Sequence, residues 1–266
     1  MESTLSLQYN DLVGDVGLFL GYGRGAAFDD PAWTKPQQNV IDSIVKSGLR
    51  QFYFPPPLEG SDSSYDWSFM RPVGTADLPS GATIVPLPDD FGGFEGQITV
   101  VAKKSTSMWP IDLVNENRIR QMFSTQPDVK GRPIMAALVP LKATTSTAGQ
   151  RQNMIFFPLA DQEYTIQFAY YILPDYLNQA FPYAYGGMAH AETIREACLK
   201  AAEEFLDDAS GVHAALFQQR LAASISMDRR NKPQKLGYNR DASDYPDITR
   251  RDLHYQNLVT IYGVQY

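Results

Sequence analysis

The sequence contains a single cysteine, Cys198, among its 266 residues. One cysteine excludes a disulfide framework within the chain. Cys198 falls on the apolar side of a helical pattern, which favours a buried, inert thiol over a catalytic nucleophile. No apolar run approaches the roughly 18 residues of a membrane-spanning helix. The N-terminal residues lack the basic and apolar segments of a signal peptide, so we expect the chain to be made and folded in a cytoplasm.

An excess of positive charge is also missing. The formal net charge is −7 and the isoelectric point is about 5.0. A general nucleic-acid binder needs a basic face to neutralise phosphates, so this composition argues against one. A local basic patch is present in the sequence at Arg229, Arg230, Lys232 and Lys235. The simpler interpretation of that patch is a solvated helix end, where the helix dipole favours cations.

Motifs of common catalytic centres are absent from the sequence. No Gly-x-Ser-x-Gly nucleophile elbow occurs. The histidines His190, His213 and His254 have no metal-ligand spacing with one another or with Cys198; we expect surface or capping roles for His190 and His213. The glycine-rich residues 21–25 follow a helical pattern and lack the Lys-Ser/Thr of a phosphate loop. We therefore predict no catalytic residue, no metal site and no cofactor.

Acidic residues leave two alternatives to that prediction. A glycosidase needs two carboxylates that flank a sugar, and these can come from distant parts of a chain. Adjacent acids occur at Asp29-Asp30, Asp89-Asp90 and Asp207-Asp208, although the first and last pairs lie at a turn and a helix end. Alternating oxygen ligands for calcium occur at Asn239, Asp241, Ser243 and Asp244, but the glycine and the closing glutamate of a calcium loop are missing.

Two helical segments near the C-terminus organise the chain. Residues 189–208 and 212–230 are separated by a short Ser-Gly break, which predicts an antiparallel helical hairpin. The first segment repeats apolar residues at three- and four-residue steps, at Ile194, Ala197, Cys198, Ala201, Ala202, Phe205 and Leu206. Such an amphipathic hairpin needs a partner, and comparable helical material lies only at the N-terminus.

The N-terminal residues predict two further helices. Residues 6–20 have helical apolar spacing and end at glycines that favour a C-cap. Residues 37–52 follow Thr34, a candidate N-cap, and Pro36, which suits a first helical turn. Because the helical segments lie at the two ends of the chain, we expect the residues between them to be an insertion into a helical bundle.

The intervening residues carry strand patterns. We predict strands in residues 67–70, 81–88, 97–103, 134–141, 154–157 and 163–172. Periodicity does not decide whether residues 111–122 are helical or extended. We expect Trp67, Phe69 and Phe91 to anchor the core between the helices and the strands. The polar last residues, from 231 onward, end in a candidate strand at 258–266, which would be an arm that adds to a neighbour's sheet or folds back on its own domain.

Several segments together resemble the bacteriophage head-to-tail adaptors of the gatekeeper or tail-tubular-protein type. These are SGLRQFYFP at 47–55, YDWSF at 65–69, PLPDDFG at 86–92, GRP at 131–133 and YTIQF at 164–168. The resemblance covers roughly residues 36–230. It implies an α+β fold: a helical bundle formed by the N- and C-terminal helices, an inserted β-rich domain and an extended C-terminal arm. The corresponding boundaries are residues 1–66, 67–184, 185–230 and 231–266.

The resemblance also implies a function. Such a chain is a structural virion protein of the head–tail neck, made in the host cytoplasm, and not an enzyme. It forms a ring, twelvefold in the family, that binds the portal protein above and a tail or nozzle protein below, touches no membrane, and lets double-stranded DNA pass without reading its sequence. We predict that the β-rich domain, or the loops 58–64 and 143–152, meets the tail component. The candidate intersubunit residues are Leu258, Val259, Ile261, Tyr262 and Tyr266.

Two rival interpretations remain at this point. The chain would be another tail component, such as a tube, terminator or baseplate protein, or a carbohydrate-binding or hydrolytic module of the virion that uses its tyrosine-rich strands as a sugar platform. Copy number in the particle separates the first rival from an adaptor. Binding or turnover of cell-wall glycans identifies the second.

Overall fold

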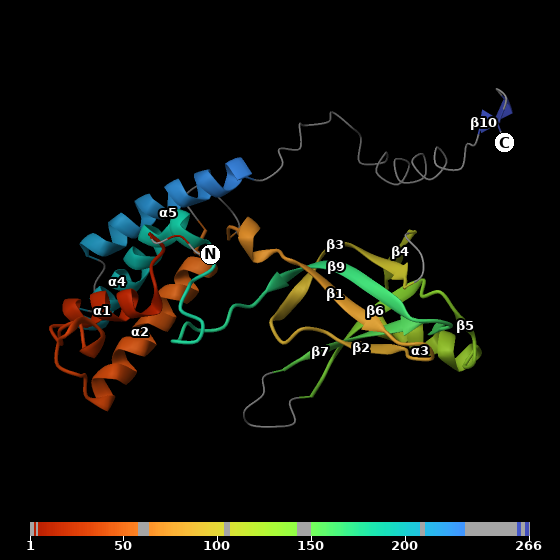
Figure 1. Ribbon diagram of the computed structural model, residues 1–266, viewed down its shortest axis with the longest axis horizontal. Coiled ribbons are helices and arrows are strands. Elements are labelled where there is room, and N and C mark those ends of the chain that lie inside the picture. Colours follow the sequence, from red (N-terminus) through yellow and green to blue (C-terminus); the bar gives the residue numbers. More distant parts are fainter. Residues whose placement is uncertain are drawn as a thin grey trace. The chain divides into compact units, whose positions relative to one another are not determined.

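A computed structural model describes residues 3, 5–57, 64–103, 107–142, 150–207, 211–231, 260–261 and 264–265. The chain divides into two units, Met1–Arg229 and Arg230–Tyr266. The first unit combines five helices, α1 to α5, with a large sheet, so the fold is mixed α/β (Figure 1). The division of the chain into the four domains expected from the sequence stays a prediction.

Four of the helices come from the two ends of the first unit. They are α1 (Tyr9–Phe19), α2 (Lys35–Tyr53), α4 (Ala191–Asp207) and α5 (Val212–Asn231). These bounds confirm the helices predicted from apolar spacing. The predicted start of α2 is confirmed in detail, because Thr34 and Gln37 form a capping box and a proline occupies the first turn. This arrangement satisfies backbone N–H groups that have no partner within the helix.

The apolar stripes of the helices pack against one another. α2 contacts both α1 and α4, and α1 also contacts α4. α5 runs antiparallel to α4. Thr193 near the start of α4 lies 2.6 Å from Ser224 in the second half of α5, and Glu203 near the end of α4 accepts a hydrogen bond from the His213 N–H at the start of α5 at 3.1 Å. The predicted hairpin is therefore present. Burial removes apolar surface from water, which is the main favourable term in the packing of these helices.

A seven-stranded sheet forms from the middle of the chain in the order β1-β9-β3-β4-β6-β7-β2 (Figure 1). The strands are β1 (Val73–Leu78), β2 (Ile84–Pro86), β3 (Phe91–Ala102), β4 (Met108–Leu113), β6 (Met135–Pro140), β7 (Gln152–Phe157) and β9 (Tyr164–Ile172). Every neighbouring pair is antiparallel except β4 with β6. A small parallel pair joins β5 (Lys130–Gly131) to β8 (Leu159–Ala160).

The sheet is nearly closed, because its edge strands β1 and β2 contact each other. The long strand β3 carries a break in register between Glu95 and Thr99, where it pairs with β9. Gly96 lies in this break with a φ of 72°. Residues with a side chain rarely adopt this left-handed backbone conformation, whereas glycine does so readily. A bulge of this kind bends a strand and increases its twist, which helps the sheet to curl.

The parallel pair β4 and β6 requires a crossover connection, and α3 (Glu116–Thr125) provides it. Asn115 caps α3 by accepting a hydrogen bond from the backbone N–H of Asn117 at 3.0 Å. Ile119 of α3 packs with Ala137 and Phe157 of the sheet in a small separate core. The undecided residues 111–122 are therefore the end of a strand followed by the start of a helix.

One strand prediction is wrong, and the strand after it was missed. Residues 67–70 are not a strand, because Ser68–Met70 form a short 3-10 helix, η2, after the buried side chain of Trp67. The strand β1 that follows was not predicted, since its alternating residues include a glycine and few apolar side chains. The predicted strands 134–141, 154–157 and 163–172 are confirmed as β6, β7 and β9.

Candidate interaction surfaces

The residues that the structure describes contain no evident metal site. None of the described histidines, cysteines and acids form a group of three or more that could hold a metal ion. Cys198 is buried on α4, and its burial raises the pKa of the thiol to about 12. A thiol that holds its proton so tightly is a poor nucleophile. Within the same described residues, no helix is long and apolar enough to cross a membrane.

An aromatic cluster joins the helices to the start of the β-rich residues. Trp67 is 1% exposed and donates a hydrogen bond from its indole nitrogen to the Phe52 carbonyl oxygen at 2.9 Å. The Trp67 ring also lies 5.2 Å from the centroids of Phe69 and His190. The expected role of Trp67 and Phe69 as anchors is thus consistent with their contacts. Phe91 packs instead with Phe94, Phe168 and Tyr170 within the sheet.

Asp228 of α5 binds residues 65–68 of the chain next to this cluster. Its carboxylate is 2% exposed and accepts hydrogen bonds from the Tyr65 hydroxyl at 2.7 Å, from the Ser68 backbone N–H at 3.0 Å and from the Ser68 hydroxyl. Burial and the nearby carboxylate raise the pKa of Tyr65 above its usual range. A buried charge is tolerated when it is hydrogen-bonded in this way, so Asp228 positions α5 against residues 65–68.

His190 differs from its expected surface or capping role. It is 4% exposed at the end of the 3-10 helix η3 (Gly187–His190) and contacts the rings of Phe52, Trp67 and Phe69. Burial lowers the pKa of the imidazole. Among the described residues its Nδ1 atom has no hydrogen-bond partner. His190 is therefore a neutral member of the aromatic core.

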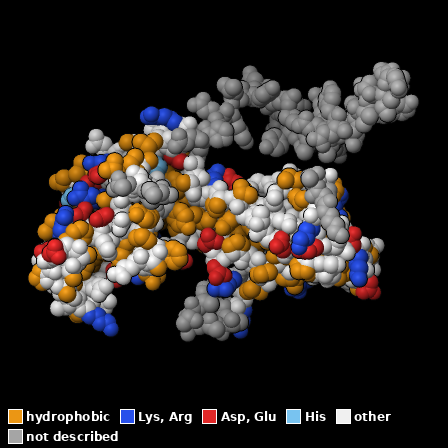
Figure 2. All heavy atoms as spheres, in the orientation of Figure 1, with side chains coloured by type: hydrophobic (Ala, Val, Ile, Leu, Met, Phe, Trp, Pro, Cys, Tyr) orange, Lys and Arg blue, Asp and Glu red, His pale blue; other side chains and the backbone are white. Residues whose placement is uncertain are grey.

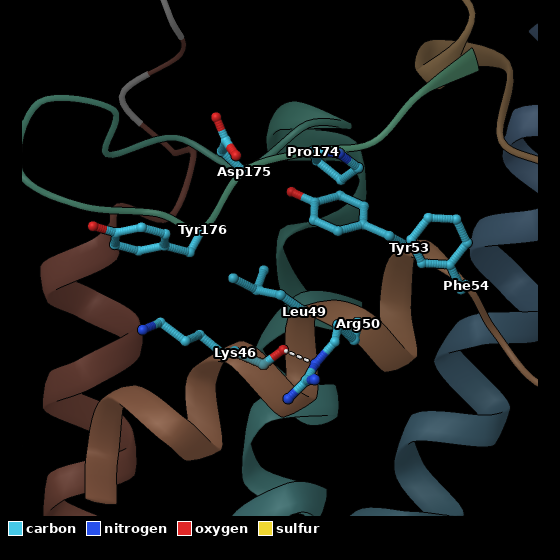
Figure 3. Close-up of a pocket in the computed structure, with 8 residues that line it drawn as sticks. All are labelled: Lys46, Leu49, Arg50, Tyr53, Phe54, Pro174, Asp175 and Tyr176. Carbon is cyan, nitrogen blue, oxygen red and sulfur yellow. Dashed lines mark hydrogen bonds between the residues drawn. The ribbon is translucent and has the colours of Figure 1, made fainter. Parts of the chain in front are cut away.

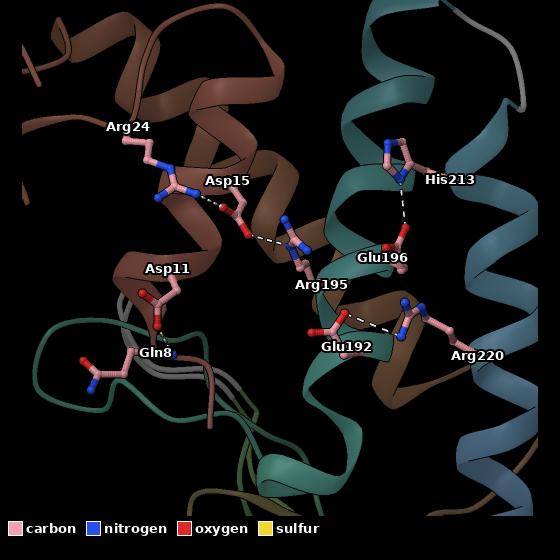
Figure 4. Close-up of polar contacts among 9 residues, drawn as sticks. All are labelled: Gln8, Asp11, Asp15, Arg24, Glu192, Arg195, Glu196, His213 and Arg220. Atoms are coloured by element: carbon pink, nitrogen blue, oxygen red, sulfur yellow. Dashed lines mark hydrogen bonds and ion pairs between the residues drawn. The ribbon is translucent and has the colours of Figure 1, made fainter. Parts of the chain in front are cut away.

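Polar contacts connect α1, α4 and α5 (Figure 4). Asp15 of α1 lies between two arginines, 3.1 Å from Arg24 and 2.6 Å from Arg195 of α4. His213 of α5 is half-buried and its Nδ1 lies 2.8 Å from the carboxylate of Glu196, which is 5% exposed. The Asp15–Arg195 ion pair joins α1 to α4, which are far apart in the sequence, and the Glu196–His213 contact joins the consecutive helices α4 and α5. The first of these contacts therefore helps to fix how the N-terminal helices pack on the C-terminal ones.

The chain between β9 and η3, residues 173–186, is an irregular segment that we call the connector. Its first residue is held by a hydrogen bond from the Leu173 N–H to the Asp90 carbonyl at 2.7 Å. Near its other end the Pro182 carbonyl accepts a hydrogen bond from the Tyr9 N–H at 2.7 Å, and the Tyr185 N–H donates to the Tyr53 hydroxyl at 3.0 Å. A shallow pocket of about 280 Å³ lies between the connector and α2. Figure 3 shows the side chains that line it, including Tyr176, whose ring lies 4.5 Å from the Lys46 ammonium.

A larger groove of about 700 Å³ follows the connector, and it shares Asp175 and Tyr176 with the first pocket. We call it the connector groove. Its lining combines three carboxylates with apolar and aromatic side chains: Asp89, Asp90, Asp175, Tyr176, Leu177, Ala180, Phe181, Pro182, Tyr183 and Tyr185. Phe181 is 73% exposed and Tyr176 is 57% exposed. Figure 2 shows hydrophobic side chains gathered with carboxylates where the helices give way to the sheet.

A second apolar surface lies at the turn between α4 and α5. Phe205 and Leu206 continue the apolar stripe predicted for α4, but they are 54% and 51% exposed. Val212 at the start of α5 is 70% exposed, and Leu18 of α1 is also exposed. Large apolar side chains gathered on a surface mark a site of protein–protein contact. The apolar stripe of α4 therefore extends beyond the part of the helix that the rest of the chain buries.

A family model for the SU10 adaptor protein matches residues 8–240. The chain belongs to this adaptor family. The match covers all five helices and the whole seven-stranded sheet, and the family is one of phage head-to-tail adaptors, which are structural proteins. The resemblance of residues 36–230 to phage head-to-tail adaptors is thereby confirmed. A search of curated proteins found none that matches this chain.

The predicted intersubunit residues of this adaptor lie mostly outside the described residues. This applies to Leu258, Val259, Tyr262 and Tyr266, to the loops 58–63 and 143–149, and to the calcium alternative at 239–244. Ile261 lies in β10 (Thr260–Ile261), which pairs antiparallel with β11 (Val264–Gln265). The single strand expected at 258–266 is thus a pair of two-residue strands, and its role in assembly stays a prediction.

Sequence reasoning did not identify the connector groove of the adaptor. Residues 173–186 show neither helical nor strand periodicity, so their sequence predicts only a loop that connects two elements. The available signal was composition, because four aromatic side chains occur in ten residues without a pattern that would bury them: Tyr176, Phe181, Tyr183 and Tyr185. Aromatic residues with a polar tip are enriched at protein interfaces.

Proposed function

We propose that the chain is the head-to-tail adaptor of a phage, and that copies of it form a ring that binds the portal protein on one side and a tail or nozzle protein on the other. The family match over residues 8–240 is the observation that carries this proposal. The location that follows is the neck of the virion, and a ring of about twelve copies agrees with the cyclic symmetry of closed assemblies.

The distribution of apolar surface supports assembly. The exposed Phe205, Leu206 and Val212 at one end of α4 and α5, and the aromatic residues of the connector, are separate surfaces on one chain. A ring with head-to-tail contacts needs two different surfaces on each subunit, one for each neighbour. We assign the helices of both chain ends to a bundle that builds the ring, the sheet to an inserted domain, and residues 231–266 to an arm.

The charge of the protein supports a passage for DNA. The net charge of −7 would give a channel wall that does not hold a passing phosphate backbone. The sugar-platform alternative has less support, because Tyr164 and Tyr170 of β9 face the core at 2% and 8% exposed. Their hydroxyls donate hydrogen bonds to Asp161 at 2.7 Å and to Asp90 at 3.3 Å.

The proposal is tested by deleting the gene for this chain from its phage. An adaptor that joins portal and tail is required after DNA packaging, so lysates should contain DNA-filled heads without tails. Adding the purified protein and a tail extract should restore infectious particles. Complete tails on heads that lack the protein would contradict the proposal, as would heads that never fill with DNA.

A further inference from the structure

The connector groove is lined by carboxylates and exposed aromatic rings. Asp89 and Asp90 come from the turn before β3, and Asp175 comes from the connector, so three carboxylates from two parts of the chain line one hollow. Asp89 lies 2.8 Å from Arg151, and Asp90 accepts the hydrogen bond from Tyr170. In the part of the chain that the structure describes, neither Asp90 nor Asp175 has an ion-pair partner. The lining of the groove itself therefore contains three carboxylates and no cationic side chain, although Lys46 and Arg50 line the adjoining pocket that shares Asp175.

The other lining residues favour a peptide over a simple cation. Four aromatic side chains that line the groove are between 40% and 73% exposed, so their rings are accessible: Tyr176, Phe181, Tyr183 and Tyr185. Aromatic faces attract arginine and lysine and also pack against apolar side chains. The chemistry of the groove thus fits an extended segment that alternates basic residues with apolar or aromatic ones.

The same chain contains a segment of this chemistry. Residues 230–240, which we call the basic segment, contain four cationic side chains and no acidic one. The cations are Arg230, Lys232, Lys235 and Arg240, and Leu236 and Tyr238 lie among them. The segment begins at the C-terminal end of α5, where Arg230 is exposed. Eleven extended residues span at most about 36 to 40 Å.

We propose that the connector groove of one copy binds the basic segment of the next copy. The groove and the segment are different surfaces of one chain, so the contact repeats from copy to copy and closes a ring. This inference rests on the proposed ring and names the contact that links its subunits. Opposite charges across the contact select the correct neighbour and speed its association.

A disulfide test uses phage particles whose adaptor carries Ala180→Cys in the groove and Gln234→Cys in the basic segment. Ala180 is exposed and lines the groove, whereas the natural Cys198 is 1% exposed and is not expected to compete. After mild oxidation, a non-reducing gel should show a ladder of covalently linked adaptor chains. A control with Thr125→Cys and Gln234→Cys should give no ladder, since Thr125 lies at the end of α3 and does not line the groove.

The outcomes separate this inference from the proposed function. If the variant chain is present in the particles but runs only as a monomer, the groove does not bind the segment of a neighbour and the inference is wrong. If the unaltered chain is absent from particles, the proposed function itself is wrong. A bond within one chain speeds the migration of the monomer and gives no ladder, which also overturns the assignment to a second copy.

A charge exchange provides a second test that needs no disulfide. Asp175→Lys or Lys235→Glu alone places like charges at the contact, and each should lower the yield of infectious particles about tenfold or more. The double variant restores opposite charges and should recover most of the yield. A double variant as defective as the worse single variant would overturn the inference, and unchanged yields for both single variants would overturn it as well.

Discussion

Gly48 of α2 lies directly against the backbone of Cys198 of α4. A methyl group on Gly48 would come within 2.6 Å of the Cys198 Cα atom and 2.7 Å of its backbone nitrogen. These distances are shorter than van der Waals contact, and backbone atoms cannot move aside as a flexible side chain can. The absence of a side chain at position 48 therefore allows α2 and α4 to pack closely, and this contact connects the N-terminal to the C-terminal helices.

The variant Gly48→Ala should destabilise the protein by about 1 to 3 kcal/mol in spite of the better helix propensity of alanine, because overpacking forces α2 and α4 apart. Urea unfolding measures the change in unfolding free energy. Ser43→Ala on the exposed side of α2 is the matched control and should be neutral or slightly stabilising. An unchanged or raised stability of Gly48→Ala would show that the helices are not in close contact.

Asp228→Asn should destabilise the protein by about 2 to 3 kcal/mol. The substitution removes the charge that accepts hydrogen bonds from Tyr65 and Ser68, and it directs an amide donor at groups that are donors themselves. Asp112→Asn, at an exposed position of β4, is the control and should change stability by less than about 0.5 kcal/mol. Equal effects of the two substitutions on the urea midpoint would contradict the anchoring role of Asp228.

Alkaline pH should unfold the protein through its buried tyrosines. Burial raises the pKa of Tyr53 above its usual range, and burial with the nearby Asp66 carboxylate raises the pKa of Tyr171 to about 12. A tyrosine is charged only after it loses its proton, so a raised native pKa stabilises the folded state fully below the unfolded pKa of about 10. That stabilisation is lost as the pH rises from about 10 toward the native values.

The measurement is the unfolding free energy between about pH 8 and pH 11, with tyrosinate absorbance recorded in parallel. The free energy should begin to fall near pH 10. Tyr53→Phe removes one of the raised groups, so its stability should fall less steeply with pH than that of the unaltered protein. A free energy that is constant across this range, or an identical slope for the variant, would disagree with the buried positions of these hydroxyls.

Removal of residues 258–266 should prevent assembly onto the portal and leave the helices intact. The helices α1 to α5 and the seven-stranded sheet end by Asn231, so the helical signal in far-ultraviolet circular dichroism should not change. Binding of the truncated chain to purified portal rings, followed by sedimentation, measures assembly. Normal rings from the truncated chain would remove Leu258, Val259, Ile261, Tyr262 and Tyr266 from consideration as an intersubunit contact.

Helices and alternating strands were predictable because their apolar residues recur with the period of the helix or the strand itself. The period of α2 and its Thr34 cap, and the alternation of Tyr164, Ile166 and Phe168 in β9, each repeat a single geometric rule. The strand β1 escaped prediction because its core contact depends on pairing with β9, a distant partner. Long-range pairing of this kind leaves little signal in the local sequence.

The interaction surfaces were less accessible to sequence reasoning. Phe205 and Leu206 have the same spacing as the buried residues of α4, so periodicity placed them in the core, whereas they extend beyond the helices that cover the rest of α4. His190 was assigned to the surface from its place near a helix start, but the fold surrounds it with Phe52, Trp67 and Phe69. Whether a side chain is covered depends on elements that are remote in the sequence.

Quantitative mass spectrometry of purified virions, with a structural protein of known copy number as the standard, counts the copies of this chain in each particle. If the chain forms a single ring at the neck, we expect about twelve copies per virion. Copy numbers in the hundreds would contradict the account and assign the chain to the tail tube or the capsid. Absence of the chain from intact virions would contradict any structural role in the particle.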